Sequence, residues 1–188
     1  MSAPLNGLNF LQQRNSAPRL TEPGPSADEL EQMLLCALRS PDHARLRPWR
    51  FVSIQGDRRV AFGELLRASL LRRDPDADQI AQDRALNAPL RAPLVIAVIV
   101  SLVEHPKVPF WEQRLSAGCA AFSLSLAAEA MDYAAIWRTG AFAEDEQLLR
   151  DIGGAENEEF VGFVYVGRRD GPAKPIPPME TAEFHRVW

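Results

Sequence analysis

The stretch "PFWEQRLSAGCAAFSLSLAAEAM", residues 109–131, decides the fold, and its spacing predicts one long helix. Leu115, Cys119, Phe122 and Leu126 form one stripe along it, and its other faces are also mostly small or apolar. A helix that is apolar nearly all round must be covered on several sides. We therefore expect this helix at the centre of the molecule, with part of its cover supplied by a second copy of the chain.

The segments around this helix predict alternating helices and strands. "LVIAVIV" (94–100), which follows Pro93, has the unbroken β-branched character of a strand buried on both faces. Ser26 and Glu29 have the spacing of a capping box at the start of another helix. The other expected elements are an N-terminal helix ending near residue 14, strands at 49–54, 134–139 and 159–167, and helices at 57–72, 76–88 and 144–151. Few strands at unequal spacing predict an α+β domain.

Composition bounds the classes of protein to consider. A chain of 188 residues suits one domain with one core, and a net charge of −4 argues against a nucleic-acid binder. The longest apolar run, 94–100, is too short to span a bilayer. The start, "MSAPLNGLNF", lacks the features of a signal peptide. We therefore expect a cytoplasmic protein with neither nucleic acid nor membrane as a partner.

Several kinds of site are not supported by any motif. His43, His105 and His185 lie far apart without H-E-x-x-H, so no metal site is expected. Neither G-x-S-x-G nor a glycine-rich phosphate loop is present. Cys36 and Cys119 form no C-x-x-C and lie in apolar contexts, which predicts buried free thiols in a reducing compartment.

The tail, residues 168–188, is rich in proline and has neither a helical nor a strand period. Such a segment could be disordered. Its apolar side chains would be costly to leave in water, which favours a tail laid across another surface. These side chains are Ile176, Met179, Phe184, Val187 and Trp188.

Three polar stretches interrupt otherwise apolar surroundings: "RNSAPRL" (14–20), "RSPDHARLRPW" (39–49) and "IWRTG" (136–140). An arginine with a serine two residues later, as in the first stretch, can grip a phosphate. Each stretch also has a simpler interpretation. The first two could be helix ends with favourable cations and a polar stop, and the third could be a strand end with an interfacial tryptophan. Since all but two of the basic residues are arginine, an arginine cluster alone decides little.

Taken together, the three stretches resemble the FMN-dependent nitroreductase family, and in particular its small single-domain NAD(P)H nitroreductase subgroup. The resemblance rests on basic-x-Ser near the N-terminus, Pro-x-His-x-x-x-x-Pro-Trp after the second helix, and Trp-Arg-Thr-Gly after the long helix. "NAPLRAPLVI" (87–96) and "KVPFWEQRLSAGCA" (107–120) have the same character. The likeness spans about residues 10–167.

The resemblance implies an α+β sandwich: one domain over residues 1–188, with a mostly antiparallel central sheet flanked by helices. It implies an intertwined homodimer with FMN at the subunit interface, and residues 168–188 packed on the partner. By similarity, the FMN contacts are Arg14, Asn15, Ser16, Trp137, Arg138 and Thr139, with Arg39 and His43 from the other subunit. A contact with the nicotinamide nucleotide would lie at Ala127, Ala128, Glu129, Ala130, Met131 and Asp132.

The implied activity is hydride transfer from NADH or NADPH, through the flavin, to a nitroaromatic or quinone in ping-pong order. No catalytic acid or base is expected, because water can supply protons at an open cleft; Arg138 or Arg39 could stabilise the reduced flavin. Two departures stand out. Asn15 replaces an arginine that many members have, and His43, Arg45 and Arg47 replace the Ser, Asn and Gln of the larger enzymes. Two alternatives remain open: a flavoprotein of the same fold that is not a reductase, and a flavin-free homodimeric interaction protein.

Overall fold

A computed structural model describes residues 7–188 of the chain. The first six residues, on which part of the localisation prediction rests, lie outside the described residues. Within 7–188, no helix combines the length and apolarity needed to cross a bilayer.

The described elements follow the expected order, with one additional short strand, Leu20–Thr21, that the sequence did not predict. The helices are α1 (Gly7–Gln12), α2 (Ala27–Ala37), α3 (Arg58–Arg73), α4 (Gln79–Asn87), α5 (Phe110–Ala130) and α6 (Glu146–Asp151). The strands are β1 (Leu20–Thr21), β2 (Trp49–Gln55), β3 (Leu94–Ser101), β4 (Ala134–Arg138) and β5 (Glu158–Arg169). Short 3₁₀ turns are η1 (His43–Arg45), η2 (Ala88–Arg91), η3 (Ala141–Glu144) and η4 (Thr181–Glu183). Ser26 and Glu29 form the expected capping box at α2.

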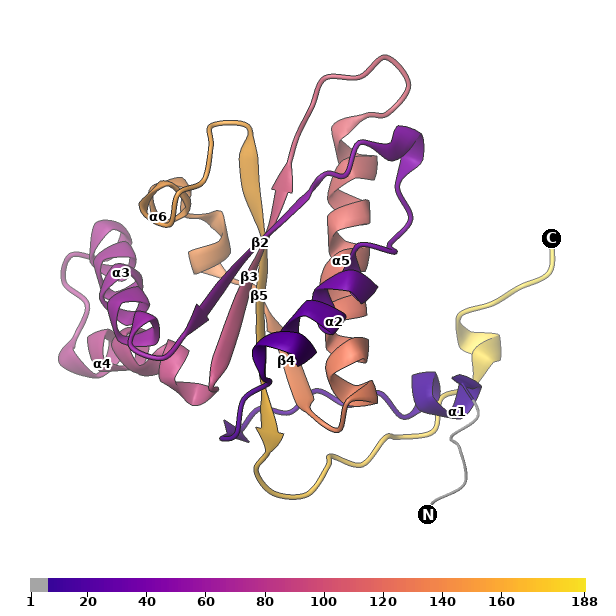
Figure 1. Ribbon diagram of the computed structural model, residues 1–188, viewed down its shortest axis with the longest axis horizontal. Coiled ribbons are helices and arrows are strands. Elements are labelled where there is room, and N and C mark those ends of the chain that lie inside the picture. Colours follow the sequence, from indigo (N-terminus) through magenta and orange to yellow (C-terminus); the bar gives the residue numbers. More distant parts are fainter. Residues whose placement is uncertain (1–6) are drawn as a thin grey trace.

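All the described strand pairs are antiparallel. The order is β1-β5-β3-β2, and β4 pairs with β5 off this path. Helices α2 and α5 cover one face of the sheet, and α3, α4 and α6 cover the other (Figure 1). The α+β prediction of a mostly antiparallel sheet flanked by helices is confirmed.

Strand β3 lies at the centre of the core, and every one of its residues is buried. Because successive side chains on a strand point to opposite faces, β3 contributes to two apolar clusters. Ile96 and Val98 pack against α2 and α5, whereas Val95 and Ala97 pack on the α3 side. This two-sided burial explains why the run of 94–100 has no polar alternation.

Helix α5 is only partly covered in the single chain. Its Ala117, Ala120 and Leu124 are buried against the sheet and α2, but Leu115 and Phe122 are 61% and 43% exposed. Cys36 and Cys119 are free but exposed, so the prediction of buried thiols is wrong for this chain. The cysteines lie on helix faces that turn away from the sheet, and an apolar sequence context alone does not reveal that orientation.

Candidate functional site

A cavity of about 450 Å³ lies between α5 and β4, and we call it the α5–β4 cavity. Arg14 and Ser16 line it from the segment after α1, and Trp137 and Thr139 line it from the end of β4. The sequence predicted all four of these residues for the flavin. The remaining lining residues, which the sequence did not single out, are Phe122, Ser125 and Ala135.

The segment after α1 is fixed beside β4 by its backbone. The amide of Ala17, which is fully buried, donates to the carbonyl of Ala135 over 3.0 Å. This contact places the segment on the outer edge of β4. Arg14 Nη1 then donates to Ser16 Oγ over 3.2 Å, so the guanidinium and the hydroxyl face the same cavity.

The alternation of strand β4 divides the third polar stretch between the two faces of the sheet. Ala135, Trp137 and Thr139 face the α5–β4 cavity. The Arg138 side chain lies on the opposite face, in a different cavity near Tyr165. The structure therefore brings Trp137 and Thr139 to Arg14 and Ser16, but it does not bring the guanidinium of Arg138 there.

Trp137 is placed by an irregularity in β5. The register between β3 and β5 shifts so that Val98 faces Gly162 and Ile99 faces Phe160, which leaves Val161 as an extra residue. The indole nitrogen of Trp137 donates to the carbonyl of Val161 over 3.3 Å. A β-bulge thus holds the tryptophan at the cavity, as bulges often do beside functional sites.

Asn15 does not line the α5–β4 cavity; it lines a neighbouring cavity of about 310 Å³. Its backbone amide donates to Glu129 Oε1 over 3.2 Å, and its side-chain amide donates to the carbonyl of Lys174 over 2.7 Å. Its Oδ1 is buried without a hydrogen-bond partner among the described residues. Arg169 Nη2 donates to the Asn15 carbonyl over 2.9 Å, so a cation lies close to the position where many family members have a second arginine.

The sequence missed Arg169 because β5 was expected to end at residue 167. The strand continues to Arg169, where it pairs with Leu20 of β1. Strand β1 has only two residues, which is too short for a periodic pattern. A longer β5 and this short β1 together bring the guanidinium beside Asn15.

The predicted nucleotide contacts lie at the end of α5. Ala127 and Ala128 are buried in the core, so their side chains are closed to a ligand. Glu129 is engaged with the Asn15 amide. Ala130 and Asp132 are exposed, and Met131 is half-buried, so these three are the members of the predicted set that a nucleotide could reach.

His43 lies at the other end of α5, whereas Ser40, the neighbour of Arg39, has its Oγ 3.4 Å from Ser123 Oγ in the second half of that helix. His43 Nδ1 is 2.7 Å from Glu112 Oε2, near the start of that helix, whereas Asn15 contacts Glu129 near its end. At 1.5 Å per residue, the two positions on the helix are about 25 Å apart. One chain therefore does not bring His43 into one site with Asn15.

The loop that carries His43 has an unusual backbone. Ala44, Arg45 and Arg47 have positive φ values of 61°, 57° and 51°. Both oxygens of the Asp42 carboxylate accept backbone hydrogen bonds, from Leu46 over 3.1 Å and from Arg47 over 2.8 Å. Non-glycine residues adopt this conformation only when the surroundings impose it, so the loop has a defined shape.

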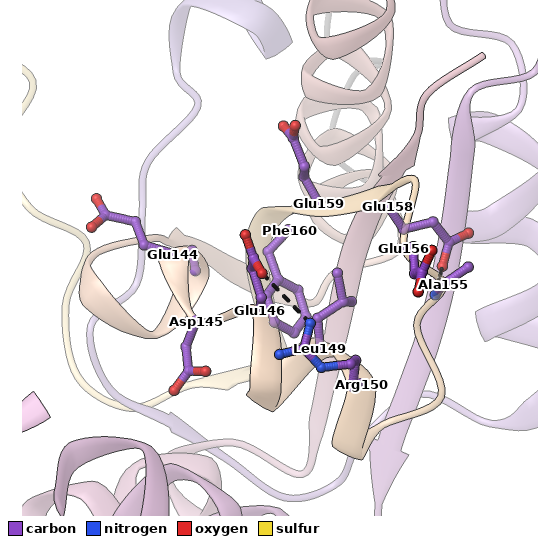
Figure 2. A pocket seen from close by; sticks show the side chains of 11 residues that line it. Glu144, Asp145, Glu146, Leu149, Arg150, Ala155, Glu156, Glu158, Glu159 and Phe160 are labelled. Carbon is purple, nitrogen blue, oxygen red and sulfur yellow. Dashed lines mark hydrogen bonds and ion pairs between the residues drawn. The ribbon is translucent and has the colours of Figure 1, made fainter. Parts of the chain in front are cut away.

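A cavity of about 670 Å³ lies between α6 and the start of β5 and is acidic. Figure 2 shows its carboxylates pointing in different directions, with Glu146 paired to Arg150. Hydrogen bonds from Arg114 hold the pKa of Glu159 below its ordinary value. Among residues 7–188, no three His, Cys, Asp or Glu side chains are arranged to hold a metal. An excess of carboxylates makes this cavity a poor host for a phosphate.

Comparison with known proteins decides the family. The model of the nitroreductase family matches residues 11–168. The chain belongs to the nitroreductase family. It is 40% identical over 163 residues to YdjA of Escherichia coli (strain K12), which is named as an NAD(P)H nitroreductase, and the match covers 87% of this chain and 88% of YdjA.

Solved structures of this family have the same fold. A nitroreductase-like family protein from Bacillus cereus superimposes with a TM-score of 0.83 at 19% identity, over 100% of this chain and 98% of the other. A nitroreductase from Bacteroides fragilis with bound FMN superimposes with a TM-score of 0.73 at 20% identity, over 96% of this chain and 97% of the other. The predicted family and the predicted nitroreductase-like fold are both confirmed.

Proposed function

We propose that this chain is an FMN-dependent oxidoreductase that uses NADH or NADPH to reduce an electron-poor acceptor, a nitroaromatic or a quinone, in ping-pong order. The observation that carries the proposal is the pairing of Arg14 with Ser16 on a 450 Å³ cavity beside Trp137 and Thr139. The names of two relatives support it: YdjA is named for NAD(P)H and a nitro acceptor, and the B. fragilis neighbour holds FMN.

The cavity suits a phosphorylated flavin. FMN supplies the hydride-accepting chemistry when it is bound. Arg14 would hold the phosphate through charge-assisted hydrogen bonds, and the Ser16 hydroxyl would add a further donor. Trp137 and Phe122 provide apolar walls for a planar ring system. Asn15 lies on the neighbouring cavity, where its contacts with Glu129 and Lys174 position the segment that carries Arg14 and Ser16.

We further propose that the working unit is a homodimer. The separation of His43 from Arg14 along α5 supports a second subunit that supplies His43, and Arg39 with it by similarity. The exposed apolar stripe of α5 and the exposed apolar tail, 168–188, offer surfaces for that subunit. The tail extends away from the sheet in Figure 1, as a segment that packs on a partner would.

The visible spectrum of the purified, dialysed protein tests the proposal. We expect flavin absorbance that NADPH bleaches without oxygen and that a nitroaromatic or quinone restores. A flavin that NADPH reduces but that neither acceptor reoxidises would favour a flavoprotein that is not a reductase. A colourless protein that takes up no added FMN would refute flavin binding. The remaining alternative would then be the flavin-free homodimeric interaction protein.

Arg14→Ala should weaken FMN binding by at least about tenfold, because charge-assisted hydrogen bonds to the phosphate are lost. The matched control is Arg19→Ala, since Arg19 lies on the same segment, is exposed and has its nearest carboxylate 4.0 Å away at Asp170. FMN titration by flavin fluorescence gives both dissociation constants. Equal retention of FMN by the two variants would remove Arg14 from the site.

A further inference from the structure

A second cavity, of about 200 Å³, lies across β4 from the α5–β4 cavity, and we call it the arginine cavity. We propose that the arginine cavity is a binding site for a small aromatic carboxylate. The lining residues are Phe62, Leu66, Ala88, Arg91, Arg138, Thr139, Phe142, Phe163 and Tyr165.

The two arginines of this cavity lack a negative partner. Neither Arg91 nor Arg138 takes part in an ion pair with any described acidic residue. The Nε of Arg138 is buried without a hydrogen-bond partner among the described residues. Burial lowers the pKa of the Arg138 guanidinium, and repulsion from Arg91 lowers it further. A half-buried cation with a like charge beside it is costly, and an anion would relieve that cost.

Tyr165 adds a neutral donor to this pair of cations. It is 5% exposed, and its hydroxyl makes no hydrogen bond with the described residues. Arg138 stacks on the Tyr165 ring, with its guanidinium carbon 5.6 Å from the ring centroid. Burial raises the pKa of Tyr165, so the hydroxyl keeps its proton at neutral pH. The polar side of the arginine cavity therefore carries two cations and two hydroxyls, those of Tyr165 and Thr139, and it favours a ligand that supplies acceptors and negative charge.

The apolar side of the arginine cavity favours an aromatic ring. Phe62, Phe142 and Phe163 line it, and the rings of Phe62 and Phe163 lie 5.8 Å apart at a tilt of 52°. A dry cavity of about 150 Å³ is enough to admit benzene. The arginine cavity is somewhat larger, so a benzene ring with one carboxylate fits, with its ring on the phenylalanines and its oxygens on the donors.

The arginine cavity is separate from the α5–β4 cavity but adjoins it. Thr139 lines both cavities, whereas Trp137 and Arg138 point to opposite faces of the sheet. A ligand in the arginine cavity should therefore bind with or without FMN. Because Thr139 is shared, that ligand should also perturb the flavin absorbance of FMN-loaded protein.

Calorimetric titration of the full chain with sodium benzoate at low salt tests this proposal, both as purified and after saturation with FMN. We expect one benzoate per chain in both states. Arg138→Met should weaken benzoate binding at least about tenfold, since a charged hydrogen bond is lost. Tyr165→Phe should weaken it less, because it removes one neutral donor. The control Arg84→Gln, an exposed residue of α4, should bind as the wild type does.

Two further measurements make the result decisive. Benzamide, a neutral molecule of similar shape that carries no nitro group, should bind at least about tenfold more weakly than benzoate if charge is recognised. Thermal melts should show that Arg138→Met folds as well as the wild type, because the half-buried guanidinium that it removes makes no ion pair with the described residues. The proposal is overturned if benzoate does not bind, if Arg138→Met binds it equally, if benzamide binds as tightly, or if FMN displaces it. The first three of these outcomes do not bear on whether FMN itself is retained.

Discussion

At the scale of single residues, Gly162 determines where Trp137 lies. Its φ of +143° is one that L side chains rarely adopt. A Cβ at this position would meet Trp137 Nε1 and would lie 2.6 Å from the carbonyl oxygen of Arg138. The glycine thus permits the close approach of β4 to the bulged part of β5, and that approach presents the indole to the α5–β4 cavity.

Gly162→Ala should therefore destabilise the protein by about 1–3 kcal/mol, from backbone strain together with displacement of the indole. Urea unfolding gives the free energy. A double-mutant cycle with Trp137→Ala separates the two causes, since the part due to the indole disappears when the indole is removed. An equal cost in both backgrounds would show that strain alone acts and that Gly162 does not position Trp137.

The sequence predicts the cavity residues Arg14, Ser16, Trp137 and Thr139 because each falls in a short motif with fixed spacing. It could also have separated Arg138 from them, since alternation along a strand sends neighbours to opposite faces. Arg169 could not be found in this way. Its position depends on the pairing of β5 with a two-residue strand, and such a contact between distant segments has no local pattern.

At the scale of elements, Asp145 joins α6 to α3. Its carboxylate caps α6 by accepting from the amide of Leu148 over 2.9 Å. It also accepts from the hydroxyl of Ser69 and, over 2.8 Å, from Arg72 Nη2, both on α3. Burial raises the pKa of Asp145, but these hydrogen bonds and the charge of Arg72 outweigh it, so the pKa lies below its ordinary value.

Asp145→Ala should cost about 2–3 kcal/mol at neutral pH, because a helix cap and an ion pair across two elements are lost together. A carboxylate with a lowered pKa stabilises the fold fully above its unfolded pKa and loses that effect as the pH falls through its folded pKa. The difference from wild type should therefore be complete above about pH 5 and shrink in more acidic solution. Urea unfolding across this range measures it.

Asp78→Ala is the matched control for this prediction. Asp78 caps α4 through the amide of Ala81 over 2.7 Å, and it makes no ion pair with the described basic residues. Its loss should cost about 1 kcal/mol, the usual value for a cap alone. Equal costs for the two variants would mean that the link from Asp145 to α3 contributes nothing to stability.

Most element boundaries could be predicted because the signals are local. Ser26 and Glu29 identify the start of α2, and the β-branched run after Pro93 identifies β3. The polar helix expected at 76–88 is shorter in the structure, because Asp78 caps α4 and the helix begins at Gln79. Helix α6 likewise begins after the Asp145 cap, at Glu146 rather than 144. Caps within polar stretches are hard to place from sequence, since several residues there could serve as the cap.

At the scale of the whole molecule, the sheet and α2 cover only part of α5. Trp111 is 59% exposed, and Leu115 and Phe122 lie on the same helix with large exposed fractions. Contiguous apolar surface of this kind is typical of a protein–protein interface. Residues 109–131 thus carry more apolar side chains than one chain buries, and the homodimer that we propose would bury the remaining ones.

Leu115→Glu should break this dimer while leaving the single chain folded, because Leu115 contributes little to the core of one subunit. Sedimentation should change from twice the chain mass to the chain mass, and FMN affinity should fall with it, since Arg39 and His43 of the second subunit are lost from the site. The control Val60→Glu places the same charge on α3, on the other face of the sheet, at a position that is 53% exposed.

A Leu115→Glu protein that remains dimeric would mean that the subunits meet elsewhere. A monomer that keeps full FMN affinity would show that one chain holds the flavin alone, and the separation of His43 from Arg14 along α5 would then have no role in the site.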